Sequence, residues 1–263
     1  MTTPLAKACF CSLLFTSACL AGQSQPCRLK QGLSAERNRL EQEYSAHQQI
    51  ADRLSAQIKA IDKEYFEFLY TLANLALKND EKALRACSNL GNRDPIASQL
   101  VALVLYLHNG RKDAARFVAS FPANKQQLTN FWSLDAISAG GTTEAATSLP
   151  GISLPDGLVD KYITELFSLA VNGNPEAMRK YTYLYKSADG DYFEFMEDQA
   201  ATFFNQHPDI VIREWPLFSS LGKKLAADQA ATTGDYPSIA TKLRMLCGHR
   251  RDQTCSEILK LFQ

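Results

Sequence analysis

The chain has 263 residues, of which 46% are hydrophobic and 21% are charged, a composition typical of a globular protein with one or two sizeable cores. Lysine plus arginine and aspartate plus glutamate number 28 each, so no overall electric field favours binding to nucleic acid or anionic lipid. We therefore expect no nucleic-acid partner.

Residues 1–22 have the features of a secretion signal. Lys7 is followed by an uncharged stretch from Ala8 to Ala21, and small residues gather at its end, where a signal peptidase cuts. This stretch is shorter than the roughly 20 residues that span a bilayer as a helix. We expect cleavage after Ala21 or Gly22 and a periplasmic or secreted protein. A buried helix or a retained anchor is the alternative.

The segment Thr16–Cys19 also resembles a bacterial lipoprotein cleavage site, in which Cys19 would be the acylated residue. That pattern normally has an aliphatic residue at the position of Thr16, so ordinary cleavage is preferred. A membrane is expected as a partner only if Cys19 is lipidated.

Four cysteines follow the signal, and an even number in an exported chain indicates disulfides. Cys247 and Cys255 are close enough in sequence to join two helices across one turn, which leaves Cys27 to pair with Cys87. Zinc binding is the competing interpretation, but the sequence lacks the CxxC and HxxxH spacings of zinc sites. We expect no metal and no cofactor.

Residues 23–78 contain a long segment without a helix breaker. From Ser34 to Lys78 there is neither glycine nor proline. Apolar or small residues recur there in alternating steps of four and three, at Leu40, Tyr44, His47, Ala51, Leu54, Ile58, Ile61, Tyr65, Phe68, Leu72 and Leu75. This spacing predicts one long amphipathic helix, or two in succession, packed against the rest of the chain. A coiled-coil dimer is the alternative, and the oligomeric state stays open.

Four similar segments, 79–85, 110–116, 141–147 and 173–179, follow apolar helical runs. Each begins with glycine or asparagine, which can adopt the left-handed conformation that ends a helix. Each has an alanine at its fifth position, small enough for two antiparallel helices to approach closely. These alanines, at 83, 114, 145 and 177, lie 31, 31 and 32 residues apart, and such a fixed period predicts stacked helical units.

The segments Asn109–Phe117 and Thr233–Pro237 resemble the tetratricopeptide-type families of helix-pair repeats. The resemblance covers about residues 65–245, although the period is shorter than the family's 34 residues. It implies a scaffold that binds proteins or peptides along a concave face. We therefore predict an all-α, α-solenoid-like fold of stacked antiparallel helix pairs over residues 65–263, preceded by a long N-terminal helix, with a loop or hinge near 148–157.

Candidate binding residues lie in two places. The first is the aromatic and acidic stretch between Tyr181 and Asp198, where Tyr183 is turned away from the face that its neighbours share and Asp191 opens an acidic helix. Most of these rings are expected in the core, but one or two outward rings beside acidic groups would form a recognition patch. Calcium binding there is the alternative, disfavoured because a helix dipole attracts acids to the first turn anyway. The second place is the loop between Cys247 and Cys255, which carries Arg250 and Arg251.

The sequence contains no recognised catalytic motif, such as Gly-x-Ser-x-Gly, His-Glu-x-x-His or a phosphate-binding loop. We therefore expect an exported interaction or scaffold protein that binds a protein or peptide in the cell envelope. One alternative is a cell-envelope hydrolase that uses scattered carboxylates such as Asp191 and Glu194. Another is an envelope inhibitor or immunity protein.

Overall fold

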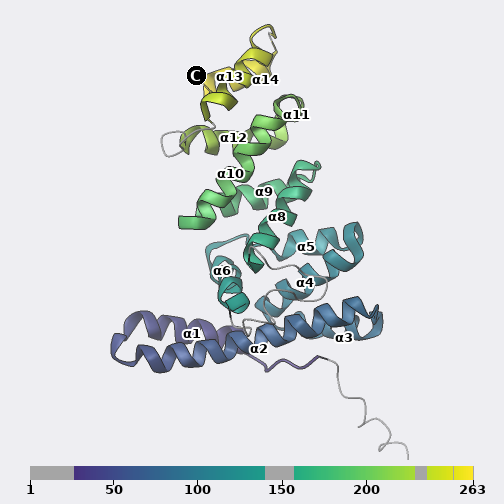
Figure 1. Cartoon of the computed structure of the whole chain (residues 1–263), viewed down its shortest axis with the longest axis vertical. Coiled ribbons are helices and arrows are strands. Elements are labelled where there is room, and N and C mark those ends of the chain that lie inside the picture. The colour runs from purple at the N-terminus through teal and green to yellow at the C-terminus, as the bar shows by residue number, and fades with distance from the viewer. Residues whose placement is uncertain (1–26, 140–156, 229–235, 251, 263) are drawn as a thin grey trace, which may run out of the picture.

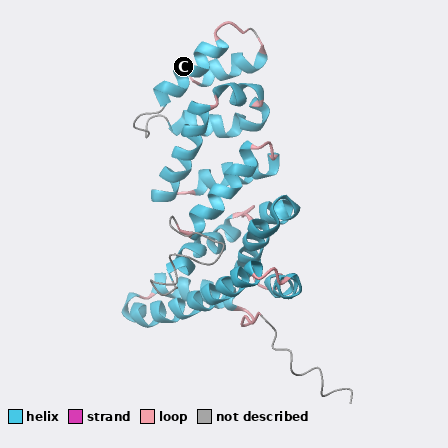
Figure 2. Cartoon of the chain, turned by 45° about the vertical axis from the view of Figure 1, so that its right-hand side comes forward, coloured by secondary structure: helices cyan, strands magenta, loops and turns pink. Residues whose placement is uncertain are grey.

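The computed structural model of the chain describes residues 27–139, 157–228, 236–250 and 252–262. Within these ranges all regular structure is helical and no strand occurs (Figures 1 and 2), which confirms the all-α class. The α-helices are α1 (Leu33–Ala46), α2 (Ala51–Leu77), α3 (Glu81–Gly91), α4 (Pro95–Asn109), α5 (Ala114–Ser120), α6 (Lys125–Ala139), α8 (Leu158–Val171), α9 (Pro175–Ser187), α10 (Gly190–Gln206), α11 (Pro208–Arg213), α12 (Trp215–Asp228), α13 (Tyr236–Cys247) and α14 (Gln253–Leu261). The short 3-10 helices η1 (Gln48–Ile50) and η2 (Gly110–Asp113) precede α2 and α5.

The helices pack in pairs near one another in sequence: α2 with α3, α4 with α5, α8 with α9, α10 with α12, which α11 separates along the chain, and α13 with α14. The first members of the pairs, together with α6, form a first row, in which α2 packs on α4, α4 on α6, α6 on α8, and α10 on α13. The second members form a second row, in which α5 packs on α9, α9 on α12, and α12 on α14. Figure 1 shows the result, a stack that rises from α1 and α2 at its base to the C-terminus at its top. The architecture is solenoid-like, as predicted.

The turn between α8 and α9 explains how one helix pair is made. Gly173 has a φ of 93°, and its backbone N–H donates to the carbonyl oxygen of Ala170 at 3.1 Å. The N–H of Asn174 donates to Leu169 at 3.1 Å, so the two bonds close a Schellman motif that ends α8. The Asn174 side chain then accepts the N–H of Ala177 at 3.0 Å and caps α9.

The turn between α2 and α3 repeats this arrangement. Asn79 takes the left-handed conformation with a φ of 53°, and the N–H of Asp80 donates to Leu75 at 3.0 Å. The Asp80 side chain accepts the N–H of Ala83 at 3.0 Å. Ala83, like Ala177, is buried at the start of the second helix. Two of the four predicted junctions therefore have the same pattern of hydrogen bonds.

The third junction differs in its local structure. Gly110 has a φ of 60° and ends α4 as predicted, but the chain then forms η2 before α5 begins at Ala114, which is only half-buried. The junction at 141–147 and most of the predicted hinge at 148–157 lie outside the described residues.

The N-terminal stripe belongs to two successive helices, one of the two predicted forms, because the chain turns at η1 between α1 and α2. Helix α2 buries its part of the stripe against α1, α3, α4 and α6 of the same chain. Tyr44 and His47 depart from the expectation, since both are exposed near the turn. No helix within the described residues is both long and apolar enough to cross a membrane.

Both predicted disulfides are present. Cys27 and Cys87, 60 residues apart in sequence, join the segment before α1 to α3 with a Cα–Cα distance of 5.3 Å. Cys247 and Cys255 join α13 to α14 with a Cα–Cα distance of 5.1 Å. The second disulfide closes the final pair of the stack, which has a neighbouring pair on one side only within the described chain.

A buried ion pair fixes α1 on the base of the stack. Arg37 Nε of α1 donates to Asp62 Oδ1 of α2 at 2.6 Å, and both side chains are 4% exposed. Arg37 Nη1 donates to Ser133 Oγ of α6 at 2.8 Å. One guanidinium group therefore holds three helices in register.

A second buried network lies beside it. Asp94 accepts hydrogen bonds from Ser34 Oγ at 2.7 Å and from the Tyr65 hydroxyl at 2.8 Å, and it caps α4 through the N–H of Ala97 at 3.0 Å. Burial raises the pKa of Tyr65 well above its ordinary value, so its hydroxyl stays protonated and can donate.

Gly173→Ala should destabilise the fold by about 1 kcal/mol, because alanine pays a steric penalty at a φ of 93° although nothing lies within 4 Å of the added methyl group. The matched variant Asn79→Gly, at the same position of the earlier turn, should leave stability unchanged or higher. Urea unfolding measures the free energy of unfolding of both variants. Equal losses in the two variants would contradict the claim that the two turns have the same structure.

Arg37→Ala should lower the free energy of unfolding by about 3–5 kcal/mol, because it leaves Asp62 buried without its cation. The double variant Arg37→Met with Asp62→Leu, which removes both charges and keeps the volume, should recover most of the loss. If the double variant were as unstable as Arg37→Ala, the unpaired charge of Asp62 would not be the cause of the lost stability.

Candidate binding grooves

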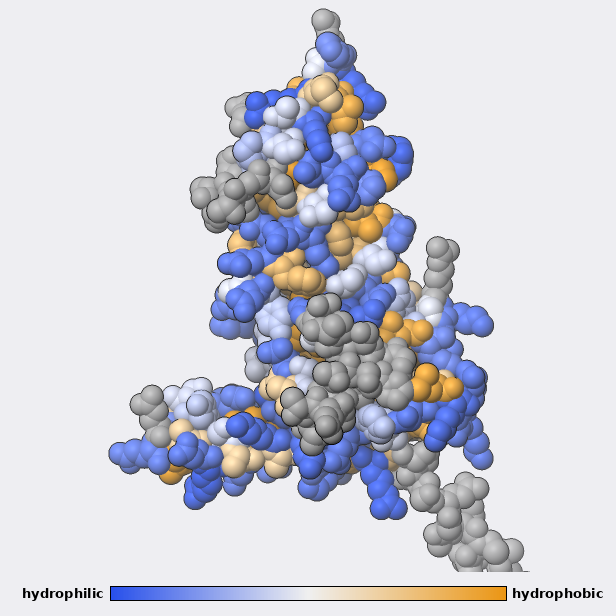
Figure 3. Space-filling view, in the orientation of Figure 1, coloured by the Kyte–Doolittle hydropathy of each residue, from blue (hydrophilic) through white to orange (hydrophobic). Residues whose placement is uncertain are grey.

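The first row of helices carries an aromatic groove between α8 and α10. It has a volume of about 400 Å³, and we call it the α8–α10 groove. Three half-buried phenylalanines contribute its apolar surface, and four polar residues complete it: Phe167, Phe195, Phe203, Asp198, Gln199, Thr202 and Gln206. On the one face that Figure 3 shows, apolar side chains reach the surface of the stack in separate patches between hydrophilic ones.

Ring contacts hold two of the three phenylalanines of this groove in place. Phe167 of α8 meets Phe203 of α10 edge to face, with ring centroids 5.9 Å apart, and it packs on the buried Tyr181 of α9 at 4.6 Å. Phe203 also stacks on Phe218 of α12 at 5.4 Å. Because both rings rest on second-row helices, the groove is preformed rather than made of loose surface side chains.

Polar contacts also join the two walls. Gln199 Nε2 of α10 donates to Thr164 Oγ1 of α8 at 3.1 Å and so joins them directly. The Tyr181 hydroxyl of α9, behind the groove, donates to the Met196 carbonyl oxygen of α10 at 2.7 Å. Burial raises the pKa of Tyr181 well above its ordinary value, so the hydroxyl remains a donor. The spacing of Phe195, Gln199, Thr202 and Gln206, in steps of four and three, places them on one face of α10.

Acidic residues line the N-terminal part of the same helix. Asp191 lies one turn before Phe195, Glu194 lies one turn before Asp198, and all three carboxylates are exposed. None of them takes part in an ion pair within the described part of the chain. The groove therefore has an uncompensated negative rim along this side.

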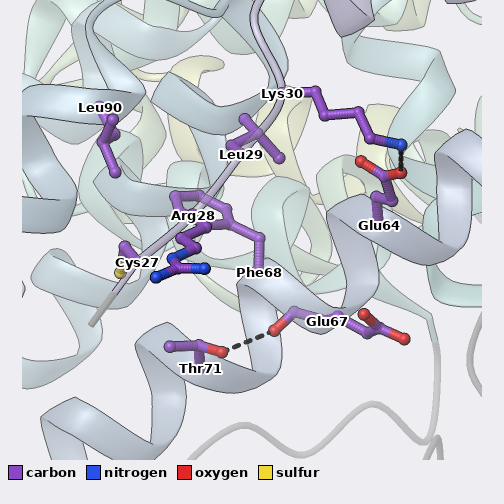
Figure 4. Close-up of a pocket in the computed structure, with 9 residues that line it drawn as sticks. All are labelled: Cys27, Arg28, Leu29, Lys30, Glu64, Glu67, Phe68, Thr71 and Leu90. Carbon is purple, nitrogen blue, oxygen red and sulfur yellow. Dashed lines mark hydrogen bonds and ion pairs between the residues drawn. The ribbon is translucent and has the colours of Figure 1, made fainter. Parts of the chain in front are cut away.

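A second groove, of about 740 Å³, lies between the extended segment Cys27–Lys30 and α2 (Figure 4). Lys30 forms an ion pair with Glu64, and this hydrogen bond raises the pKa of Lys30. Arg28 and Glu67 are exposed in the same groove, so positive and negative groups compensate one another. Because its charges are mixed, this groove indicates the chemistry of a ligand less clearly than the α8–α10 groove does.

A cluster of buried polar groups lies where α9, α10 and α12 meet. The Tyr185 hydroxyl, Glu197 Oε1 and Asp228 Oδ2 are buried, and the three groups interact electrostatically with one another. Lys224 pairs with Asp228 at 2.9 Å and lies 5.4 Å above the Tyr185 ring. The charges of Glu197 and Asp228 reinforce the effect of burial, which raises the pKa of Tyr185 far above its ordinary value.

Glu197 is a second group of this cluster whose pKa is raised. Burial is the largest cause of this rise in the pKa of Glu197. The negative charges of Asp228 and Asp198 add to the rise, and the positive charge of Lys224 opposes it. The folded chain therefore binds more protons than the unfolded chain between the ordinary pKa of a glutamate and the raised value. Stability falls as pH rises through this window and is not restored at higher pH.

The sequence-predicted binding residues lie on three different elements. Asp191 is exposed on α10 beside the α8–α10 groove, Tyr183 is half-buried on α9, and Arg250 is exposed between α13 and α14. Arg251 lies outside the described residues. The structure does not bring these residues together into one site.

The phenylalanines of the groove were not predicted as site residues. Phe195 belongs to the aromatic stretch, where it was expected to be an ordinary packing residue; the structure leaves it half-buried in the lining of the groove. Phe167 and Phe203 belong to helical patterns dominated by core positions, so only the meeting of α8 and α10 identifies them as groove residues.

Comparison of the chain with family models, curated proteins and solved structures finds no match. The tetratricopeptide-type resemblance therefore has no support from a family model. No group of three or more histidine, cysteine, aspartate or glutamate side chains that could hold a metal occurs among the described residues. The fold defines the class of the protein as an all-α array of packed helix pairs.

Glu197→Gln should raise the free energy of unfolding at pH 7 and flatten its fall with rising pH, because a neutral amide replaces a carboxylate that is costly to ionise. Glu194→Gln, an exposed change on the same helix, is the matched control and should follow the wild type. Denaturant unfolding between pH 4 and 8 measures both; parallel curves for Glu197→Gln and the wild type would contradict this.

Proposed function

We propose that the protein is an exported interaction protein whose helix-pair array binds another protein or a peptide in the cell envelope, in the periplasm or outside the cell. The observation that carries this proposal is the preformed aromatic groove between two first-row helices. Half-exposed, rigid rings supply contact area at little cost in conformational entropy, which is why aromatic residues concentrate binding energy at interfaces.

The compartment rests on the cysteines and the N-terminal sequence. Two disulfides are typical of proteins that fold in an oxidising environment, and residues 1–22 have the composition of a secretion signal. Lipidation at Cys19 stays the alternative to ordinary cleavage, and mass spectrometry of the mature N-terminus distinguishes the two.

The alternative of an envelope hydrolase gains no support from the carboxylates on which it depended. Asp191 and Glu194 are exposed on the surface of α10, beside a groove whose only acidic lining residue among those described, Asp198, lies on the same helix, and no histidine lines it. General acid–base catalysis requires a partner that faces them within reach of the substrate. A peptide-binding surface fits these residues better.

The proposal predicts that the oxidised protein, used as bait, retains at least one specific partner from the envelope fraction of its native cell, and that the purified pair forms a complex of fixed stoichiometry. Phe195→Ala should weaken this complex, because it removes an apolar contact without a ring contact to the core that would unfold the array. Tyr70→Ala, which removes an exposed aromatic ring of α2, is the matched control.

Calorimetry on the purified pair measures both variants. Folded bait that retains no partner, or a complex equally insensitive to Phe195→Ala and Tyr70→Ala, would contradict the proposal.

A further inference from the structure

We propose that the α8–α10 groove selects a peptide segment that inserts an apolar side chain among the phenylalanines and carries lysine or arginine next to it. This inference rests on the proposed function and names the chemistry of the partner. It follows from the way the apolar surface and the acidic rim are placed relative to one another.

The groove is an open hollow that can accept an apolar side chain of a bound peptide. Its volume of about 400 Å³ is bounded by Phe167 on α8 and by Phe195 and Phe203 on α10. Phe167 and Phe203 are held by ring contacts to α9 and α12, so an inserted leucine or aromatic side chain meets rigid walls. Apolar anchors that pack among aromatic rings concentrate the binding energy of an interface.

The charge around the anchor position is negative on one side. Asp198 lines the groove itself, Glu194 precedes it by one turn, and Asp191 precedes Phe195 by one turn. All three side chains are exposed, so they remain hydrated and can pair with a cation that arrives with the partner. A peptide with basic residues beside its anchor would thus be attracted, and an acidic one repelled.

The nearby lysines of the array do not cancel this rim. On α8, Lys161 is paired with Glu165 at 2.8 Å. On α13, Lys242 Nζ donates to the carbonyl oxygen of Asn205 at 2.9 Å, near the opposite end of α10 from Asp191. The potential therefore changes along the groove, and the basic residues of the peptide should lie toward the N-terminal part of α10.

The same rim argues against the other large partners that use exposed aromatic rings. Nucleic acid and anionic membranes both present phosphate groups, which uncompensated carboxylates repel. A neutral apolar peptide would fill the groove but would leave the three carboxylates unused.

The test uses the full oxidised protein and fluorescent ten-residue peptides that carry one central leucine or phenylalanine. One set has lysines beside the anchor, the second has glutamates there, and the third has lysines with alanine in place of the anchor. Fluorescence anisotropy at low and moderate salt should show binding of the first set alone, weakening as salt rises. Equal binding of the first and second sets, or no binding by any set, would overturn the inference.

Charge-reversal variants then locate the site. The double variant Glu194→Lys with Asp198→Lys should bind the lysine peptides about tenfold more weakly and should gain binding of the glutamate peptides. Asp52→Lys, an exposed reversal on α2, is the matched control and should change neither. Near-UV circular dichroism checks that each variant retains its packing.

The outcomes separate this inference from the function on which it rests. If a partner isolated from the cell binds the wild type and the double variant equally, the protein is an interaction protein but this groove does not select basic peptides. A loss with Asp52→Lys that is equal per reversed charge would likewise assign the effect to overall charge rather than to the groove.

Discussion

The fold depends on one constraint: each described helix buries its apolar face against helices that are near it in sequence. Helix α9, for example, packs on α8 beside it and on α5 and α12 in the second row, while α13 packs on α10, α11 and α14. Such a chain forms an array without a single central core, so each pair depends on its neighbours for stability. The ends of the array lack one neighbour, and it is there that the buried Arg37–Asp62 pair and the two disulfides add restraints.

The sequence predicted the helical class, the disulfide pairs and the position of three turns, because each of these is a local signal. Asn79 and Gly173 end their helices through left-handed backbone conformations that the residue type itself favours. The exposure of Tyr44 was not predicted, since a heptad-like spacing cannot reveal where the chain turns and the partner helix ends. The η2 insertion before Ala114 was likewise hidden, because the same Gly-x-x-x-Ala spacing fits both kinds of turn.

The groove was less accessible from the sequence than the fold was. Asp191 could be singled out because an acidic helix start is a local pattern, and the aromatic stretch around Phe195 drew attention for the same reason. Phe167 and Phe203 lie on the outward edges of helices whose patterns are dominated by core positions. Their role follows only from the meeting of α8 and α10, which is a property of the stack. The basic loop with Arg250 is a separate surface that the array does not connect to this groove.

The central claim, that helix pairs stack into an elongated array, is tested most directly by small-angle X-ray scattering of the oxidised monomer that begins at Gln23. A compact protein of this length would have a radius of gyration of about 18 Å. The account predicts a clearly larger radius and an asymmetric distance distribution with a long tail, as the rising stack in Figure 1 requires. A symmetric distribution with a radius near the compact value would contradict it.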